Sequence, residues 1–225
     1  MKVLDLCCGL GGATKAFKDR GHEVFTVDIN PKFQPTLCRD VRDIRPEELP
    51  DADFIWASPP CNTFSVASVP TYMAEECPDL PCSTCFLANR AKKKKFPASG
   101  QVEGIEIALA CRLLIRAKKP RFWVIENPTA MMRHILGLPA VTTFFASWED
   151  NTHKKSTDLW GKLPPMTWPE PKNWIPSPRG SKHPDTEITI PYGLSLALCI
   201  AIENEMNGQK PPLTLEGFAQ TMTEV

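Results

Sequence analysis

KVLDLCCGLGG, residues 2–12, is the stretch that decides the fold. An apolar run that ends directly in glycines is typical of a buried strand followed by a tight turn. The next residues, 12–20, place Ala13, Ala16 and Phe17 on one face of a helix. The chain is therefore predicted to open with a strand, a glycine turn and a helix.

Other apolar runs predict the remaining strands, which we place at 22–28, 53–57, 121–125, 141–148 and 157–160. Helices are predicted over 102–118, where Ile105, Leu109 and Leu113 have helical spacing, and over 193–207. Strands that alternate with helices form a mostly parallel sheet with helices on both faces. We therefore expect an α/β fold with its active site at the carboxyl ends of the strands.

The composition is that of a globular protein: 225 residues, 42% of them hydrophobic and 23% charged. No apolar run approaches the roughly 20 residues of a membrane helix. The start of the chain is too short and too acidic for a signal peptide. We therefore expect a cytoplasmic protein with no membrane partner. A formal net charge of zero neither requires nor excludes a nucleic acid as partner.

Three notable clusters follow predicted strands, and the first is the glycine run 9–12. Its glycines would let a ligand approach the backbone closely at the start of a helix. Asp28 ends the next strand, where a carboxylate can accept hydrogen bonds from ribose hydroxyls. The run reads G-x-G-G rather than G-x-G-x-x-G, so a nicotinamide dinucleotide fits poorly. A purely structural turn is the alternative interpretation.

The other two clusters are Ser58-Pro59-Pro60-Cys61 and Glu126-Asn127-Pro128. Two prolines hold a rigid, extended turn that presents Cys61 at the edge of the sheet. A thiol in positive surroundings can act as a nucleophile, whereas a buried structural cysteine is the alternative. A partly desolvated Glu126 would have a raised pKa and could donate a proton near neutral pH. An acidic helix cap is the alternative for this residue.

Together these motifs resemble the DNA cytosine-5 methyltransferases, and the chain looks closest to small phage-type or orphan members. The resemblance spans residues 1–206 and rests on the glycine loop, the Pro-Pro-Cys turn and the Glu-Asn turn, in the family's order. Residues 155–160, KSTDLW, resemble a segment of the small members. The resemblance implies a Rossmann-like class I methyltransferase fold, S-adenosyl-L-methionine as cofactor and cytosine in DNA as substrate.

The resemblance also implies a mechanism in which Cys61 adds to carbon 6 of cytosine and Glu126 holds or protonates ring nitrogen 3. Carbon 5 then takes the methyl group, and the target base must leave its stack. Lys155, or its neighbour Lys154, stands where the family has an arginine near the base. Either lysine could support oxygen 2 of cytosine or lower the pKa of Cys61.

The family's cofactor-binding positions carry over onto residues of this chain. Cys7 stands where the family often has an aromatic residue stacked on adenine, and another residue could take that place. Residues 190–195 resemble a reduced form of the family's last cofactor motif. The predicted cofactor-binding residues are Leu6, Cys7, Gly9, Leu10, Gly11, Gly12, Asp28, Ile29, Asp40, Val41 and Pro60.

The resemblance divides the chain into four expected parts. These are a catalytic, cofactor-binding domain over 1–160 with a long loop at 62–100, a reduced Pro-rich target-recognition segment over 161–191, a helix over 192–208 that completes the catalytic domain, and a tail over 209–225. The recognition segment is too short for a large reading domain, so we expect loose specificity or a specificity partner. Trp160, Trp168 and Trp174 could stack on a splayed base or form a small core. The sequence predicts no oligomeric state.

Cys77, Cys82 and Cys85 have the spacing C-x4-C-x2-C, which is suggestive of zinc. No fourth ligand is obvious from the sequence. The chain has 9 cysteines, an odd number, so they cannot all pair as disulfides within one chain. A structural zinc ion is therefore one interpretation of this cluster, and free thiols are the alternative.

Other functions remain open on the sequence alone. An enzyme of the same fold could methylate cytosine in RNA or in a free nucleotide, which the short recognition segment favours. A non-catalytic nucleic-acid-binding relative would be expected to lack Cys61 or Glu126, and both are present. Amino methylation would usually place an aromatic residue after Pro60, where Cys61 stands. Transfer of a group other than methyl is also compatible with the sequence.

Overall fold

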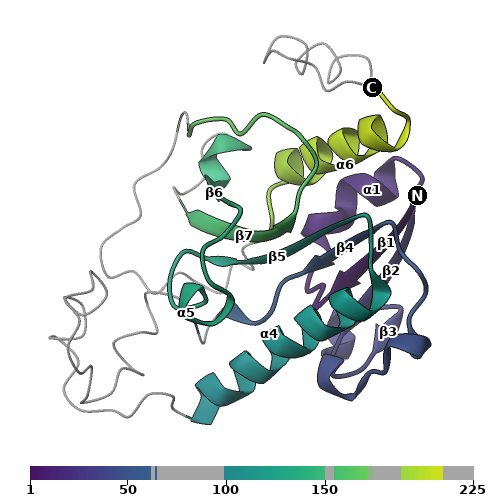
Figure 1. Ribbon diagram of the computed structural model, residues 1–225, viewed down its shortest axis with the longest axis vertical. Coiled ribbons are helices and arrows are strands. Elements are labelled where there is room, and N and C mark those ends of the chain that lie inside the picture. The colour runs from purple at the N-terminus through teal and green to yellow at the C-terminus, as the bar shows by residue number, and fades with distance from the viewer. Residues whose placement is uncertain (62–63, 65–98, 150–154, 172, 174–188, 210–225) are drawn as a thin grey trace, which may run out of the picture.

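The computed structural model describes residues 1–61, 64, 99–149, 155–171, 173 and 189–209 (Figure 1). The described residues form a seven-stranded sheet in the order β3-β2-β1-β4-β5-β7-β6. Its strands are β1 (Lys2–Leu6), β2 (Glu23–Asp28), β3 (Leu37–Cys38), β4 (Phe54–Ala57), β5 (Phe122–Pro128), β6 (Val141–Phe144) and β7 (Ser156–Lys162). The α-helices are α1 (Lys15–Asp19), α4 (Ser99–Lys118), α5 (Arg133–Leu136) and α6 (Tyr192–Met206).

The topology is that of a doubly wound sheet. The strands β3, β2, β1, β4 and β5 run parallel, whereas β7 is antiparallel to both β5 and β6. The chain changes direction across the sheet between β1 and β4, and ligands of such sheets bind at that point, beyond the carboxyl ends of the strands. α1 and α6 pack together on one face, and α4 covers the other (Figure 1). The predicted Rossmann-like α/β fold is confirmed.

Alternating side chains of the strands build a separate apolar core on each face of the sheet. Leu4 and Ile55 pack on the α4 side, and their chain neighbours Val3 and Phe54 pack on the α6 side. Phe54 stacks on Phe17 of α1 with the ring centroids 5.2 Å apart. Each such side chain stabilises the fold by about 1.5–3 kcal/mol when it is fully buried. Covering both faces is therefore what holds the parallel strands together.

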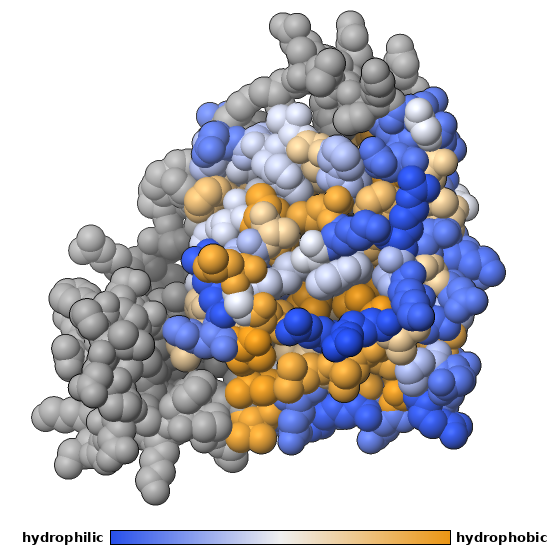
Figure 2. All heavy atoms as spheres, in the orientation of Figure 1, coloured by the Kyte–Doolittle hydropathy of each residue, from blue (hydrophilic) through white to orange (hydrophobic). Residues whose placement is uncertain are grey.

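The helix α4 presents a different face to the sheet from the one its sequence suggested. Leu109 is 41% and Leu113 is 64% exposed, whereas Ala108 and Cys111 are fully buried. Figure 2 shows apolar side chains gathered along α4 on the face turned to the viewer. Leu114 and Ile115 are also buried, each 3% exposed, so the inner face combines small residues, which let the helix approach the sheet, with two larger ones that fill the core.

Three strand boundaries also differ from the prediction. β5 continues through Pro128 instead of ending at Ile125, because its last residues pair with β7. β6 ends at Phe144, where the predicted strand 141–148 gives way to a 3-10 turn. β3 has only two residues and was not predicted, since so short a strand shows no periodicity.

Large parts of the predicted loop 62–100, recognition segment 161–191 and tail 209–225 lie outside the described residues, so the division into parts stays a prediction. Trp160 is buried in the core on the α4 side. Trp168 meets Trp148 edge to face, with the centroids 5.8 Å apart. These two indoles therefore contribute to apolar packing, as the core alternative proposed. None of the described helices is long and apolar enough to cross a membrane.

Gly161 lies where β7 passes close to β5. A Cβ atom at Gly161 would lie 1.9 Å from the backbone oxygen of Trp123, which cannot move aside without disturbing the ladder. We expect Gly161→Ala to lower the free energy of unfolding by roughly 2–3 kcal/mol, measured by chemical denaturation. The exposed neighbour Lys162 offers a control, because Lys162→Ala should change the free energy of unfolding by less than about 0.5 kcal/mol. Equal stability of the two variants would contradict this packing.

Candidate active site

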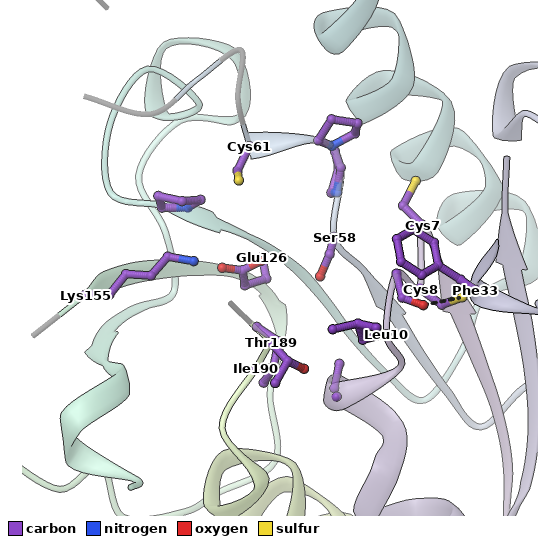
Figure 3. A pocket seen from close by; sticks show the side chains of 16 residues that line it. Cys7, Cys8, Leu10, Phe33, Ser58, Cys61, Glu126, Lys155, Thr189 and Ile190 are labelled. Atoms are coloured by element: carbon purple, nitrogen blue, oxygen red, sulfur yellow. Dashed lines mark hydrogen bonds between the residues drawn. The ribbon is translucent and has the colours of Figure 1, made fainter. Parts of the chain in front are cut away.

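A cavity of about 260 Å3 opens at the carboxyl ends of β1, β4 and β5 (Figure 3). The glycine loop after β1, the Pro-Pro-Cys turn after β4 and the end of β5 all contribute to its walls, so the three sequence clusters meet in one place. The lining residues are Cys7, Cys8, Gly9, Leu10, Gly12, Ala13, Phe33, Ser58, Pro59, Pro60, Cys61, Glu126, Pro128, Lys155, Thr189 and Ile190.

The Pro-Pro-Cys turn is fastened to both neighbouring strands. The backbone N–H of Ser58 donates to a carbonyl oxygen of β1 at 3.0 Å, and Asn127 Nδ2 donates to the carbonyl oxygen of Pro59 at 2.9 Å. Asn127 is fully buried, so this second bond is shielded from water. Because Asn127 directly follows Glu126, the bond fixes Cys61 relative to that carboxyl group.

Glu126 reaches the cavity from within β5 and is only 5% exposed. Burial raises the pKa of its carboxyl group, and the charge of Lys155 and hydrogen bonds to Thr157 and Ser58 oppose the rise only in part. A carboxyl group with a raised pKa keeps its proton closer to neutral pH and can then act as a donor. The structure therefore shows Glu126 as a desolvated acid inside a strand, not as a helix cap.

Cys61, Glu126 and Lys155 extend into the same cavity from three different segments (Figure 3). Cys61 is exposed at the cavity, yet partial desolvation by its surroundings is the largest influence on its thiol and raises the pKa, while Lys155 lowers the pKa and Glu126 raises it. Lys155 thus acts on the thiol in the expected direction, but burial outweighs it. The Nζ atom of Lys155 also lies 4.5 Å from the centroid of the Phe145 ring. Lys154, the alternative lysine, lies outside the described residues.

The glycine loop turns sharply because several of its residues have left-handed backbone. The φ angle is 57° at Cys7, 50° at Gly9 and 72° at Gly11. Asp28 holds the loop from below: its Oδ2 accepts the N–H of Gly9 at 2.9 Å, and its Oδ1 accepts that of Asn30 at 2.8 Å. A Cβ atom at Gly9 would meet nothing within 4 Å, so the loop leaves open space there.

The predicted cofactor residues fall into two groups. Those that line the cavity are Cys7, Gly9, Leu10, Gly12 and Pro60. Those that do not are Leu6, Gly11, Asp28, Ile29, Asp40 and Val41. Leu6 and Val41 are buried in the core on the α4 side. Asp40 pairs with Arg42 at 2.5 Å, and Ile29 is 65% exposed. The cofactor roles of both groups stay predictions.

Two cavity residues, Phe33 and Thr189, had no part in the sequence prediction. Phe33 ends a 3-10 turn, Pro31–Phe33, whose N-terminus Asn30 caps. An Asn-Pro pair predicts such a turn, but not where the following ring points. Thr189 crosses the glycine loop so closely that a Cβ atom at Gly12 would lie 1.8 Å from its Oγ1 atom. No local pattern reveals a contact between residues so distant in sequence.

The predicted zinc ligands Cys77, Cys82 and Cys85 lie outside the described residues. Within the described ranges, one group of three possible metal ligands occurs at His22, Cys199 and Glu203. The guanidinium of Arg20 already pairs with both carboxylate oxygens of Glu203, at 3.1 and 2.8 Å. Arg20 thus already neutralises the Glu203 carboxylate, and we interpret the cluster as an ion-pair network and not as a metal site.

Comparisons with known proteins find matches both in sequence and in structure. The model of the C-5 cytosine-specific DNA methylase family matches residues 1–98. A protein of Frog virus 3 (isolate Goorha) described as "Probable DNA (cytosine-5)-methyltransferase" is 24% identical over 166 residues, which are 71% of this chain and 70% of that protein. A solved structure from E. coli, described as a "putative DNA modification methyltransferase encoded within prophage", aligns with a TM-score of 0.45 and 15% identity, over 72% of this chain and 46% of that chain.

The described residues form a Rossmann-like domain with a cavity at the carboxyl ends of its strands. The two sequence matches are more specific than the fold. Over residues 1–98 the chain is similar to the C-5 cytosine-specific DNA methylase family.

Beneath the glycine loop, Asp5 of β1 is fully buried. Thr14 Oγ1 donates to its Oδ2 at 2.6 Å, while Oδ1 has no hydrogen-bond partner among the described residues. Burial raises the pKa of Asp5 to about 7, against the lowering effects of the Thr14 bond and of Lys18. A buried carboxyl group that ionises near neutral pH makes this part of the fold sensitive to pH.

Since burial raises the pKa of Asp5 above that of the unfolded chain, the neutral carboxyl group favours folding. This contribution is complete below about pH 4 and is lost as the pH rises toward the folded-state pKa of about 7. As the pH rises from about 4 to 8, the free energy of unfolding should fall less in Asp5→Asn than in the wild type, with a difference of up to roughly 4 kcal/mol. Urea denaturation across this range measures the difference; parallel pH curves would contradict the burial of Asp5.

Proposed function

We propose that the protein methylates carbon 5 of cytosine in DNA with S-adenosyl-L-methionine, through a covalent adduct at Cys61. The meeting of Cys61, Glu126 and Lys155 in one cavity that the glycine loop also lines is the observation that carries this proposal. A nucleophile, an acid and a cation in one small space are what addition to a pyrimidine ring needs. Similarity to the C-5 cytosine-specific DNA methylase family over residues 1–98 and to the viral protein supports the same activity.

The glycine-loop side of the cavity fits S-adenosyl-L-methionine. The open space at Gly9 lets a ligand lie against the backbone. Leu10 offers an apolar surface, and the ring of Phe33 offers a plane on which adenine can stack in place of the aromatic residue missing at Cys7. When bound there, the cofactor would supply an electrophilic sulfonium methyl group.

Cys61 would form the bond to carbon 6 that makes carbon 5 nucleophilic. Its raised pKa keeps the thiol neutral in the free protein, so the thiol proton has to leave when the base arrives. Lys155 favours this ionisation through its positive charge. Because the sulfur lies in a cavity, a base stacked in a duplex cannot reach it, and the target cytosine has to flip out of the helix.

Glu126 would donate its proton to ring nitrogen 3 while the sulfur adds to carbon 6, which prevents negative charge from building up on the ring. Its raised pKa supports the neutral, donating form. Once carbon 5 carries the methyl group and S-adenosylhomocysteine is left, the carbon 5 proton passes to water, the bond from Cys61 to carbon 6 breaks, and the thiolate that is released regains its proton from water. Ring nitrogen 3 then returns its proton to Glu126, so that one carboxyl group serves both halves of the reaction.

Sequence specificity is a separate part of the proposal. Residues 161–191 are too few for a large reading domain. We therefore propose that recognition of the DNA around the target base is loose or is supplied by a partner protein.

Cys61→Ser should abolish methyl transfer, because a hydroxyl group is a far weaker nucleophile than a thiolate. Transfer of labelled methyl to duplex DNA, transfer RNA and dCMP is measured in parallel, followed by nucleoside analysis. We expect 5-methylcytosine in DNA with the wild type and with Cys38→Ser, which alters an exposed thiol outside the cavity. Turnover by Cys61→Ser at the wild-type rate would reject the mechanism, and product in RNA or dCMP alone would change the substrate.

Phe33→Ala should weaken cofactor binding about 3- to 10-fold, because it removes an aromatic plane worth about 0.5–1.5 kcal/mol. Calorimetric titration with S-adenosylhomocysteine measures the effect on the complete protein. Phe33→Trp keeps an aromatic ring and is expected to bind nearly as tightly as the wild type. Identical affinities for all three proteins would show that the ring does not touch the cofactor.

A further inference from the structure

Thr157 of β7 contacts the acidic group of the cavity from behind. Its Oγ1 atom is within hydrogen-bonding distance of Glu126 Oε1, and it lies 3.1 Å from the carbonyl oxygen of Asn127. Thr157 is fully buried, so no solvent competes for its hydroxyl group. The antiparallel register places Thr157 opposite Pro128, two residues beyond Glu126 on the adjacent strand.

The hydroxyl group of Thr157 has one proton and two neighbouring oxygens that could take it. A carbonyl oxygen can only accept, whereas a carboxyl oxygen accepts when ionised and donates when protonated. If Glu126 is neutral, Thr157 Oγ1 can accept a hydrogen bond from the carboxyl group and donate one to the carbonyl oxygen of Asn127. If Glu126 is ionised, Thr157 can rotate its hydroxyl group and donate a hydrogen bond to the carboxylate. The same hydroxyl group therefore has a satisfied arrangement in both protonation states.

We propose that Thr157 is a positioning residue that stabilises both protonation states of Glu126 by reversing its hydrogen bond as the acid gives up and regains its proton. The inference rests on the proposed function, because it describes how the acid of that reaction is supported. When ring nitrogen 3 takes the proton, the new carboxylate receives a buried donor at once, without the movement of water. Hydrogen bonds to a charged acceptor are the stronger ones, so this donor favours the transfer.

The other groups around Glu126 cannot provide this two-way bond. Lys155 is a charge that only donates, and the thiol of Cys61 is reserved for the base. The charge of Asp158 also raises the pKa of Glu126. Both carboxylate oxygens of Asp158, however, accept hydrogen bonds from Arg133, at 2.6 and 2.7 Å. Thr157 is therefore an uncharged group in direct contact with the acid.

Ser58 provides a second hydroxyl group near Glu126 with a different restriction. Trp56 Nε1 donates to Ser58 Oγ at 2.7 Å, and an indole N–H can only donate. The Ser58 oxygen thus already accepts one hydrogen bond, and its own proton can be donated to Glu126; a hydrogen bond between these two side chains lowers the pKa of that acid. Ser58 supports the ionised form, whereas Thr157 can support either form.

The test compares Thr157→Val, Thr157→Ser and Thr143→Val in the full chain. Valine removes the hydroxyl group and retains a branched shape that suits a strand. Thr143 of β6 pairs directly with Thr157 and is also buried, but its hydroxyl group accepts a bond from Trp148, so it controls for the general cost of the change. The ionisation of Glu126 is followed by the infrared carbonyl band of its protonated carboxyl group, identified by its loss in Glu126→Gln. Methyl transfer to DNA is measured over the same pH range.

We expect Thr157→Val to move the infrared titration of Glu126 and the alkaline limb of kcat to higher pH. It should lower kcat about 10- to 100-fold, with KM for DNA changed by less than about 2-fold. Thr157→Ser should restore both properties, and Thr143→Val should leave the titration in place. An unchanged titration in Thr157→Val, or a loss of activity equal at every pH, would overturn the proposal. If the titration of Glu126 shifts in Thr157→Val but the wild type does not methylate cytosine, the proposed function would be refuted while the two-way bond itself would stand.

Discussion

The hydrogen bond from Asn127 Nδ2 to the carbonyl oxygen of Pro59 is the constraint on which the site depends. It joins the turn that carries Cys61 to the strand that carries Glu126, and full burial of Asn127 protects it from water. Without this bond the turn that carries Cys61 would lose its side-chain tie to the strand that carries Glu126. With it, the two groups keep one separation, and a ring that contacts the first also meets the second.

Burial governs the chemistry of the site more than charge does. It raises the pKa values of Cys61, Glu126 and Asp5 alike. For Glu126 this favours the neutral form that can donate a proton, and for Cys61 it suppresses a reactive thiolate until a substrate arrives. Lys155 opposes burial at both groups without cancelling it. The positive charge of Lys155 therefore lies beside two groups whose neutral forms are favoured by their surroundings.

The sequence predicted the strands and motifs that depend on neighbouring residues. It did not predict features that depend on pairing between strands distant in sequence. The apolar runs before Gly9, Cys61 and Glu126 were enough to predict parallel strands with these clusters at one edge. The continuation of β5 through Pro128 could not be predicted, because it requires β7 as a partner. The contact of Thr157 with Glu126 follows from the same register and has no local signal.

Packing explains the remaining differences in the same terms. The inner face of α4 combines the small Ala108 and Cys111 with the larger Leu114 and Ile115. Asp28 has both carboxylate oxygens in bonds to loop N–H groups, so its first task is to shape the glycine loop. That role is compatible with a ribose contact, but the strand pattern alone did not reveal it. Thr189 closes over Gly12 from a segment almost at the other end of the chain.

The decisive measurement is a crystal structure of the protein after reaction with S-adenosyl-L-methionine and a duplex that contains 5-fluorocytosine. We expect one extrahelical ring, methylated at carbon 5, with its carbon 6 bonded to Cys61 Sγ and its nitrogen 3 next to the carboxyl group of Glu126. A fluorocytosine that stays stacked in the duplex, or one bonded to Cys61 with Glu126 turned away from the ring, would contradict the proposed mechanism.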